Sequence, residues 1–145
     1  MVTVKEILQA KDPGVWTIAP NVEVFEALKV MADKNVGALI VVENDRVVGI
    51  MSERDYARKI ALLGKLSQNT PVRDIMTSEV YVVPPEATAD ECIVLMTEKR
   101  IRHLPVIAAD KLVGVVSIGD IVKTIISHQQ GVIEHLENYI TGKYL

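Results

Sequence analysis

The order of apolar and polar positions along the chain predicts the same set of elements twice. Short apolar runs ended by proline, at 16–18 and 80–83, are typical of brief strands. Apolar residues at helical spacing follow each run: Val24, Leu28 and Met31 in the first case, and Ala89, Ile93 and Met96 in the second. Two apolar strands separated by a polar turn come next, at 38–42 and up to Met51, and at 104–107 and up to Val116. Helices are then expected to begin at Glu53 and Ile118, each after a serine suited to the N-cap.

The two sets of elements are copies of one unit. Gly49 falls on Gly114 when the chain is shifted by 65 residues, and many other positions then coincide. The identical pairs include Pro20 and Pro85, Met31 and Met96, Leu39 and Leu104, Asp45 and Asp110, Ser52 and Ser117, and Asp55 and Asp120. Upstream, residues 4–7 match 72–75 in a shifted register, because the first copy has a longer loop through 12–14. We therefore expect an α+β protein with repeats at 1–66 and 67–127 and a helical tail at 128–145.

The final helix is longer than the second repeat requires. Its apolar stripe consists of Val122, Ile125, Ile126, Val132, Ile133, Leu136 and Tyr139. Gly131 lies within the stripe region. A glycine weakens a helix by roughly 1 kcal/mol relative to alanine, so the helix can bend at this position. The stripe can pack back on its own domain or against a helix of another subunit, and the pattern leaves both open.

Composition and charge exclude several classes of protein. A net charge of −3 in 145 residues argues against bulk electrostatic binding to nucleic acid. The single cysteine, Cys92, excludes an internal disulfide, and no apolar run approaches the length of a membrane span. The three histidines, His103, His128 and His135, show no metal-ligand spacing, and no G-x-x-x-x-G-K-[ST] loop is present. We expect a soluble cytoplasmic protein without a bound metal and without catalytic activity.

The repeated pattern G-x-x-S-x-x-D, at 49–55 and 114–120, carries the candidate chemistry. A serine at a helix N-cap leaves its hydroxyl and the first free N–H groups available to a phosphate. The aspartate three residues later, Asp55 or Asp120, can accept hydrogen bonds from the hydroxyls of a ribose. The same spacing is also that of a capping box, in which the carboxylate reaches back to the N–H of the cap. The pattern alone favours the capping box.

The repeats, the strand RHLPVI and the two G-x-x-S-x-x-D ends resemble a tandem pair of CBS domains, the module named after cystathionine β-synthase and also called a Bateman module. The resemblance covers nearly the whole chain up to about residue 127. It implies two β-α-β-β-α repeats that are related by a pseudo-twofold axis and packed sheet to sheet. It also implies two clefts that commonly bind adenosine-containing ligands, and pairs of modules that often dimerise.

Carried onto this sequence, the resemblance builds each cleft from the Ser/Asp end of one repeat and the strand start of the other. The first cleft would take its phosphate and ribose contacts from Ser52, Arg54, Asp55, Arg102 and His103, and its base contacts from Val82, Val83 and Ile101. The second, weaker cleft would use Thr17, Ile18, Val36, Gly37, Ala38, Ser117 and Asp120. Because Gly119 replaces Arg54 and Gly37-Ala38 replace Arg102-His103, we expect the second cleft to contain no cation. This joint placement favours phosphate binding in the first cleft over the capping box.

Three hypotheses about function remain. The favoured one is a regulatory module that requires no cofactor, binds an adenine nucleotide of the AMP, ADP, ATP or NAD type, forms a homodimer and signals energy or redox state to an unknown regulated protein. The second is a structural or interaction protein with empty clefts that assembles through its repeats and tail. The third is an enzyme of unknown reaction, for which the sequence offers no catalytic residue.

Overall fold

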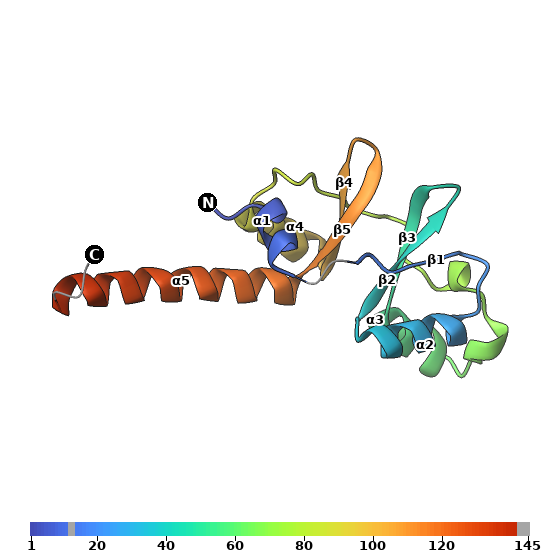
Figure 1. Ribbon diagram of the computed structural model, residues 1–145. Helices are drawn as coiled ribbons and strands as arrows, with labels where there is room; N and C mark the ends of the chain where they lie inside the picture. Colours follow the sequence, from blue (N-terminus) through green and yellow to red (C-terminus); the bar gives the residue numbers. More distant parts are fainter. Residues whose placement is uncertain (12–13, 142–145) are drawn as a thin grey trace. The chain divides into compact units, whose positions relative to one another are not determined.

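The computed structural model describes residues 1–11 and 14–141 and has an α+β fold (Figure 1). The helices are α1 (Val4–Ala10), α2 (Val24–Lys34), α3 (Glu53–Tyr56), α4 (Ala89–Lys99) and α5 (Ile118–Thr141). The strands are β1 (Thr17–Ile18), β2 (Ala38–Glu43), β3 (Arg46–Ser52), β4 (His103–Ala108) and β5 (Lys111–Ser117). A π-helical turn at Ala57–Ala61 extends α3, and 3-10 turns lie at Ser67–Asn69 and Val72–Asp74. The predicted fold class and C-terminal helix are confirmed.

The element bounds repeat with the spacing of the sequence. Helix α2 and strands β2 and β3 map onto α4, β4 and β5 by the same shift of 65 residues. Both helices end in a left-handed residue, Asn35 at φ 54° and Arg100 at φ 55°. Strands β2 and β3, and likewise β4 and β5, are joined by two residues with positive φ: Asn44 and Asp45 in the first repeat, and Ala109 and Asp110 in the second. Two consecutive residues with positive φ match the twist of a tight antiparallel hairpin. Alanine disfavours positive φ, so the hairpin geometry imposes this conformation on Ala109.

The first strand of the second repeat is reduced to a single bridge. In the first repeat β1 pairs in parallel with β2, and the N–H of Ile40 donates to the carbonyl of Trp16 at 3.3 Å. The counterpart of Ile40 is Pro105, which has no N–H to donate. Only the bridge between Val83 and Val106 forms, with the Val83 N–H donating to the Pro105 carbonyl at 3.1 Å. The strand expected at 80–83 is therefore absent as a regular strand.

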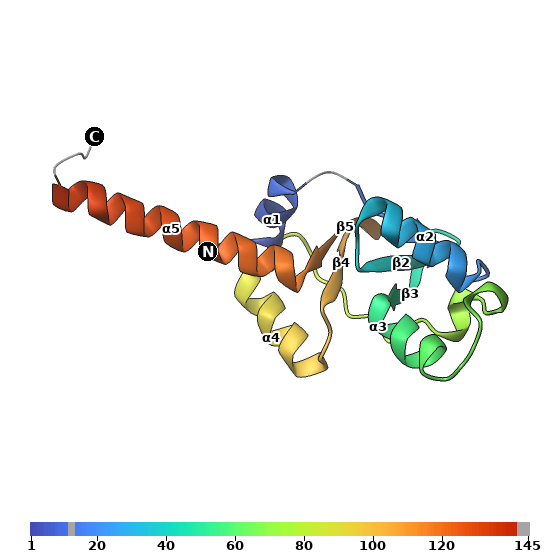
Figure 2. The same ribbon diagram turned by 90° about the horizontal axis from the view of Figure 1, so that it is seen from below.

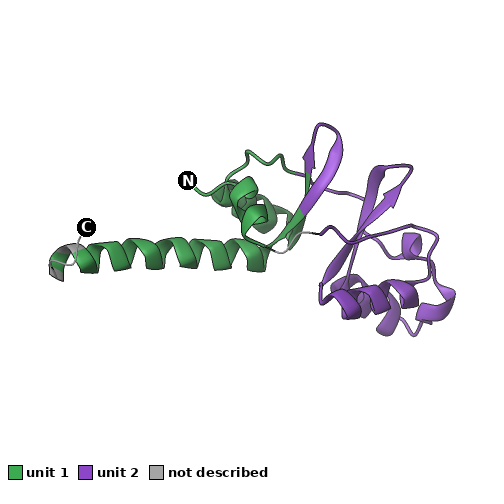
Figure 3. Cartoon of the chain, viewed as in Figure 1, with its two compact units in different colours: residues 1–13, 83–106, 115–145 green, residues 14–82, 107–114 purple. Residues whose placement is uncertain are grey.

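Two compact units divide the chain differently from the two sequence repeats (Figure 3). Unit 1 contains residues 1–13, 83–106 and 115–145, and unit 2 contains residues 14–82 and 107–114. Each unit includes the segment that begins the other repeat. The two segments, at the start of α1 and at the turn Val72–Asp74, are equivalent in sequence.

In unit 1 the chain around α1 bonds to the entry of α4. The Val4 N–H donates to Ala87 at 2.8 Å, and the Ala89 N–H donates to the Val2 carbonyl at 2.9 Å. Helices α1 and α4 lie beside the first turns of α5 (Figure 2). The buried apolar residues of this unit are Val4, Ile7, Val83, Ala87, Ala89, Cys92, Met96, Leu104, Val106, Val116 and Ile121.

Unit 2 repeats these bonds with the equivalent residues. The Val72 N–H donates to the Val22 carbonyl at 2.8 Å, and the Val24 N–H donates to the Thr70 carbonyl at 2.8 Å. Its core cluster consists of Val24, Ala27, Met31, Leu39, Val41, Met51, Ile60, Val72 and Ile75. Each N-terminal segment thus completes the core of the unit that holds the other repeat's helix.

Strand β3 meets the segment after Ile75 at a glycine. Ile50 and Thr77 exchange backbone hydrogen bonds of 3.0 and 2.8 Å. A Cβ on the neighbouring Gly49 would lie 2.6 Å from the Met76 sulfur and 3.1 Å from the Thr77 carbonyl oxygen. A side chain at this position would therefore have to displace the Met76 side chain and shift the Thr77 carbonyl.

Candidate functional site

The first Ser/Asp end forms a capping box in unit 2. Ser52 is the N-cap of α3, and its hydroxyl accepts from the Asp55 N–H at 3.1 Å. Oδ2 of Asp55 accepts from both the N–H and the hydroxyl of Ser52, each at 3.0 Å. The capping box, one of the two interpretations of the pattern, is thus present.

The other oxygen of the same carboxylate is also occupied. Oδ1 of Asp55 accepts from the Thr77 hydroxyl at 3.2 Å and lies 3.2 Å from Nζ of Lys59. A carboxylate offers about four acceptor positions, and here three hydrogen bonds and the contact with the Lys59 ammonium occupy them. Asp55 is 9% exposed. A ribose hydroxyl can therefore bond to Asp55 only by displacing one of these donors.

The second Ser/Asp end forms the equivalent box in unit 1. The Ser117 N–H donates to Oδ2 of Asp120 at 2.9 Å, and the Asp120 N–H donates to the Ser117 hydroxyl at 3.1 Å. Nζ of Lys11 donates to the same oxygen at 2.7 Å and to the Val115 carbonyl at 2.9 Å. Within the described residues no hydrogen bond reaches Oδ1 of Asp120. That oxygen can accept another donor without a rearrangement.

The pKa of Asp120 reflects this environment. Partial burial by itself raises the pKa of the carboxyl, but the hydrogen bonds from Lys11 and Ser117 and the charge of Lys11 outweigh that effect. The net result is a pKa below the ordinary value for aspartate. Asp120 is thus an anion in contact with a cation at neutral pH.

The prediction that the second Ser/Asp end lacks a cation is wrong. In the first repeat Lys59 lies four residues after Asp55 on the same helix and reaches its carboxylate. The residue equivalent to Lys59 is Thr124, whose hydroxyl donates to the Asp120 carbonyl at 2.8 Å. Lys11, from the segment before β1, supplies the cation instead. The contact between Lys59 and Asp55 could be predicted from their i, i+4 spacing. Lys11 lies next to the longer loop of the first repeat, and no local spacing relates it to Asp120.

The structure places the strand starts beside the serine of their own repeat. In unit 2 the Glu53 N–H donates to the Gly37 carbonyl at 3.1 Å, and Ala38 pairs with Ser52. In unit 1 the Ile118 N–H donates to the Arg102 carbonyl at 2.9 Å.

The other predicted residues are distributed over both units. The side chains of Arg54, Thr17, Val82 and Arg102 are exposed, those of Ile18, Val36, Ile101 and His103 are half-buried, and that of Val83 is buried. Each expected cleft combines residues of unit 1 with residues of unit 2.

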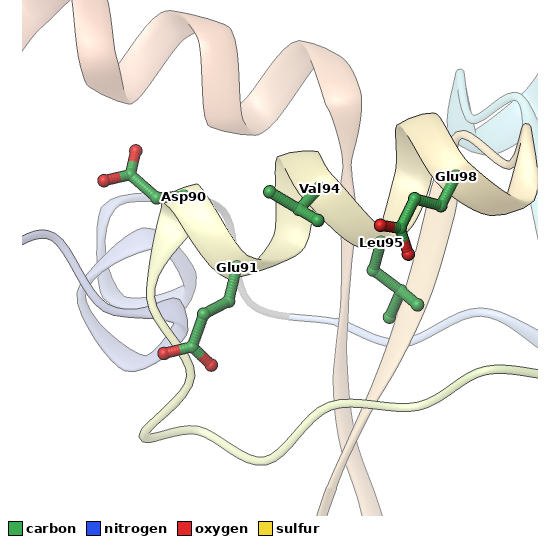
Figure 4. Close-up of a pocket in the computed structure, with 5 residues that line it drawn as sticks. All are labelled: Asp90, Glu91, Val94, Leu95 and Glu98. Carbon is green, nitrogen blue, oxygen red and sulfur yellow. The ribbon is translucent and has the colours of Figure 1, made fainter.

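Two surface hollows lie away from the Ser/Asp ends. The first, of about 370 Å³, is on the outer face of α4 and is lined by Asp90, Glu91, Val94, Leu95 and Glu98 (Figure 4). Its three carboxylates oppose the binding of a phosphate. The second, of about 480 Å³ in unit 2, lies among the hairpin turns and includes Val82 alone among the predicted site residues.

The residues that the structure describes contain no group of three or more histidine, cysteine, aspartate or glutamate side chains that could hold a metal ion. None of their helices has the length and apolar character needed to cross a membrane.

Comparison with known families identifies the repeats. The CBS domain family matches residues 4–62 and 72–127, and the chain therefore belongs to the CBS domain family as a tandem pair. The paired Ser/Asp ends lie at the last strand and helix of each matched segment.

A curated relative and a solved structure support this assignment. The chain is 39% identical to the CBS domain-containing protein CBSX3, mitochondrial, of Arabidopsis thaliana, over 98% of this chain and 73% of that protein. A putative signal-transduction protein with CBS domains from Burkholderia ambifaria is 48% identical, with a TM-score of 0.85 over 88% of this chain and 96% of that one.

One of two other similar solved structures contains ligands, and the other is a hexamer. The CBS domain pair of protein MJ0100, in complex with 5′-methylthioadenosine and S-adenosyl-L-methionine, is 27% identical with a TM-score of 0.76, over 88% of this chain and 98% of that one. A hexameric CBS-CP12 protein from bloom-forming cyanobacteria is 33% identical with a TM-score of 0.76, over 84% of this chain and 70% of that one.

Proposed function

We propose that this protein is a non-catalytic regulatory module that binds an adenine nucleotide and transmits energy or redox state to a partner protein. The observation that supports it most directly is the adenosine chemistry of both ligands in the related CBS pair. Binding would favour one conformation or assembly of the module, which the partner then recognises.

The proposed nucleotide contacts follow the two Ser/Asp ends. At the first end, Ser52, Arg54 and Asp55 act with Arg102 and His103 on phosphate and ribose. Val82, Val83 and Ile101 contact the base. The second set consists of Thr17, Ile18, Val36, Gly37, Ala38, Ser117 and Asp120.

The carboxylate contacts add a distinction between the two ends. Asp120 has an oxygen to offer a ribose hydroxyl, whereas Asp55 must release Thr77, Lys59 or the Ser52 hydroxyl first. Releasing Lys59 from Asp55 makes its ammonium available to a phosphate. The same exchange at Asp120 would make Lys11 available. Both ends can therefore respond to an anionic ligand by releasing a lysine, whereas only the first must also rearrange to accept a ribose hydroxyl.

The first test compares AMP with adenosine by calorimetry in the wild type and in Arg102→Ala. A charge-assisted contact that is well desolvated contributes roughly 1.5–3 kcal/mol, so AMP should bind about tenfold or more weakly to the variant. Adenosine, which lacks the phosphate, should bind both proteins equally. Arg73→Ala, another exposed arginine outside the proposed set, is the control. Equal AMP affinities in wild type and Arg102→Ala would contradict a role for Arg102 in phosphate binding.

The Ser/Asp ends are separated by Asp55→Ala and Asp120→Ala in the same titration. Loss of a ribose contact should weaken both AMP and adenosine, unlike the arginine variant. Because each substitution also removes a capping box, each variant is first shown to be folded by circular dichroism. If folded variants of both aspartates bind AMP like the wild type, the pattern serves only as a helix cap.

The alternative of a structural or interaction protein is favoured by one observation, the exposed apolar face of α5. If none of AMP, ATP, NAD and S-adenosylmethionine binds, this alternative replaces the nucleotide sensor. In either case we propose a homodimer, since closed twofold pairing is the commonest assembly of identical chains.

A further inference from the structure

Helix α5 carries an unusually exposed apolar stripe. Every described side chain from Ile126 to Asn138 is exposed, and the C-terminal part of the helix extends beyond α1 and α4 (Figures 1 and 2). The exposed fractions are 46% for Val122, 48% for Ile126, 49% for Val132, 54% for Ile133, 54% for Leu136 and 80% for Ile140. Unit 1 alone does not bury this surface.

The stripe has the spacing of a helix-pairing seam. Five of its apolar residues and the polar Gln129 form a seam whose positions alternate by four and three: Val122, Ile126, Gln129, Ile133, Leu136 and Ile140. This is the heptad spacing that keeps one side of a helix facing a partner helix. Residues 122 and 140 are about 27 Å apart along the axis at 1.5 Å per residue. A partner helix of the same length could cover the whole seam.

The charged residues beside the seam favour a second copy of α5 in antiparallel orientation. Lys123 and Glu137 lie on the same flank, each one position after a seam residue, with Gln130 midway between them. When two copies of α5 run antiparallel, this flank of one copy meets the same flank of the other. Lys123 of each copy then lies near Glu137 of its partner, twice by symmetry. A second copy of the chain is therefore the occupant that the charges fit.

We propose that α5 pairs with the α5 of a second copy in an antiparallel two-helix seam. Ile126 then packs opposite the partner's Leu136, Ile133 opposite the partner's Gln129, and Ile140 opposite the partner's Val122. This rests on the proposed homodimer and specifies the surface and orientation through which it forms.

The first experiment measures the dimer dissociation constant by analytical ultracentrifugation for wild type, Ile133→Asp and Ser127→Asp. Because both copies carry the change, Ile133→Asp buries two carboxylates and should raise the constant by at least about a hundredfold. Ser127→Asp adds the same charge away from the seam and should leave it nearly unchanged. Ile133 is exposed in the protomer, so its replacement does not disturb the core.

The outcomes separate the two proposals. A wild type that is monomeric at all concentrations overturns both the homodimer and the seam. A dimer whose dissociation constant is the same in Ile133→Asp as in wild type overturns the seam and leaves the homodimer standing.

The second experiment tests the orientation by cross-linking. Lys123→Cys and Glu137→Cys proteins are treated with a short bis-maleimide, separately and after mixing. An antiparallel seam gives covalent dimers only in the mixture, because Cys at 123 lies near position 137 of the partner and far from position 123. The native Cys92 is buried, and wild type serves as the control for its reactivity. Dimers in the separate samples, or none in the mixture, overturn the antiparallel arrangement.

Discussion

Lys11 and Asp120 join the beginning of the chain to the start of α5. Their contact is 2.7 Å long, and the two side chains retain 35% and 25% exposure, so solvent screens part of the attraction. The bond to the Val115 carbonyl holds Lys11 in place as well. The pair thus anchors the end of α1 within unit 1, in addition to any contact with a ligand.

This pair makes stability depend on pH in a defined direction. We expect Lys11→Met to lower the free energy of unfolding by about 0.5–1 kcal/mol at pH 7. Because the pKa of Asp120 is lowered in the folded protein, its stabilisation is complete above the ordinary value of 3.8 and is lost as pH falls through the folded value. The difference between wild type and variant should therefore shrink as the pH falls below the ordinary value of 3.8.

Urea unfolding at these pH values measures both quantities. Lys29→Met, which removes the more exposed pair with Glu26, should change stability by less at every pH. A difference that grows on acidification would contradict the assigned role of Asp120.

At the scale of the elements, two glycines have opposite roles. Gly49→Ala should lower the free energy of unfolding by about 1–3 kcal/mol, because the added Cβ meets the Met76 sulfur and the Thr77 carbonyl. Gly131→Ala should raise it by up to about 1 kcal/mol, since a Cβ there meets no atom within 4 Å and alanine favours a helix. Thermal and urea unfolding of the two variants measure these changes. If both substitutions change the free energy of unfolding equally, β3 and the segment after Ile75 separate easily.

The sequence predicted the elements well because their patterns are local. The helix starts at Glu53 and Ile118, the tight hairpins and the repeat spacing all follow from residues close together in the chain. The absence of a regular strand at 80–83 could have been predicted from Pro105, but only if the pairing of this segment with β4 had been known. The position of Lys11 could not be predicted, because its contact with Asp120 spans 109 residues. The capping boxes are present, whereas the nucleotide contacts of Ser52, Asp55 and their counterparts remain predictions.

For the whole molecule, the division into units predicts which residues protect Cys92. Ile7 and Ile75 occupy equivalent places in the two N-terminal segments, and both are buried. Cys92 belongs to unit 1 with Ile7, although it shares its sequence repeat with Ile75. We therefore expect Ile7→Ala to accelerate thiol labelling of Cys92 more than Ile75→Ala does, because local opening exposes the thiol.

Labelling rates in native buffer, compared with the global unfolding free energy of each variant, measure this effect. Burial raises the pKa of the Cys92 thiol, so labelling reports opening rather than a reactive thiolate. Rates that follow only the global stability of the two variants would show that the units open together.

The exchange of N-terminal segments also sets an order of events during synthesis. Residues 2–5 leave the ribosome before their backbone partners at 85–89, which follow roughly 80 residues later, about 4–16 s at 5–20 residues per second. Until then Val4 and Ile7 have no core to enter. The corresponding segment at 70–73 is synthesised after its backbone partners Pro20, Val22 and Val24. Unit 2 can therefore begin to assemble on the nascent chain, while unit 1 has to wait for α4 and α5.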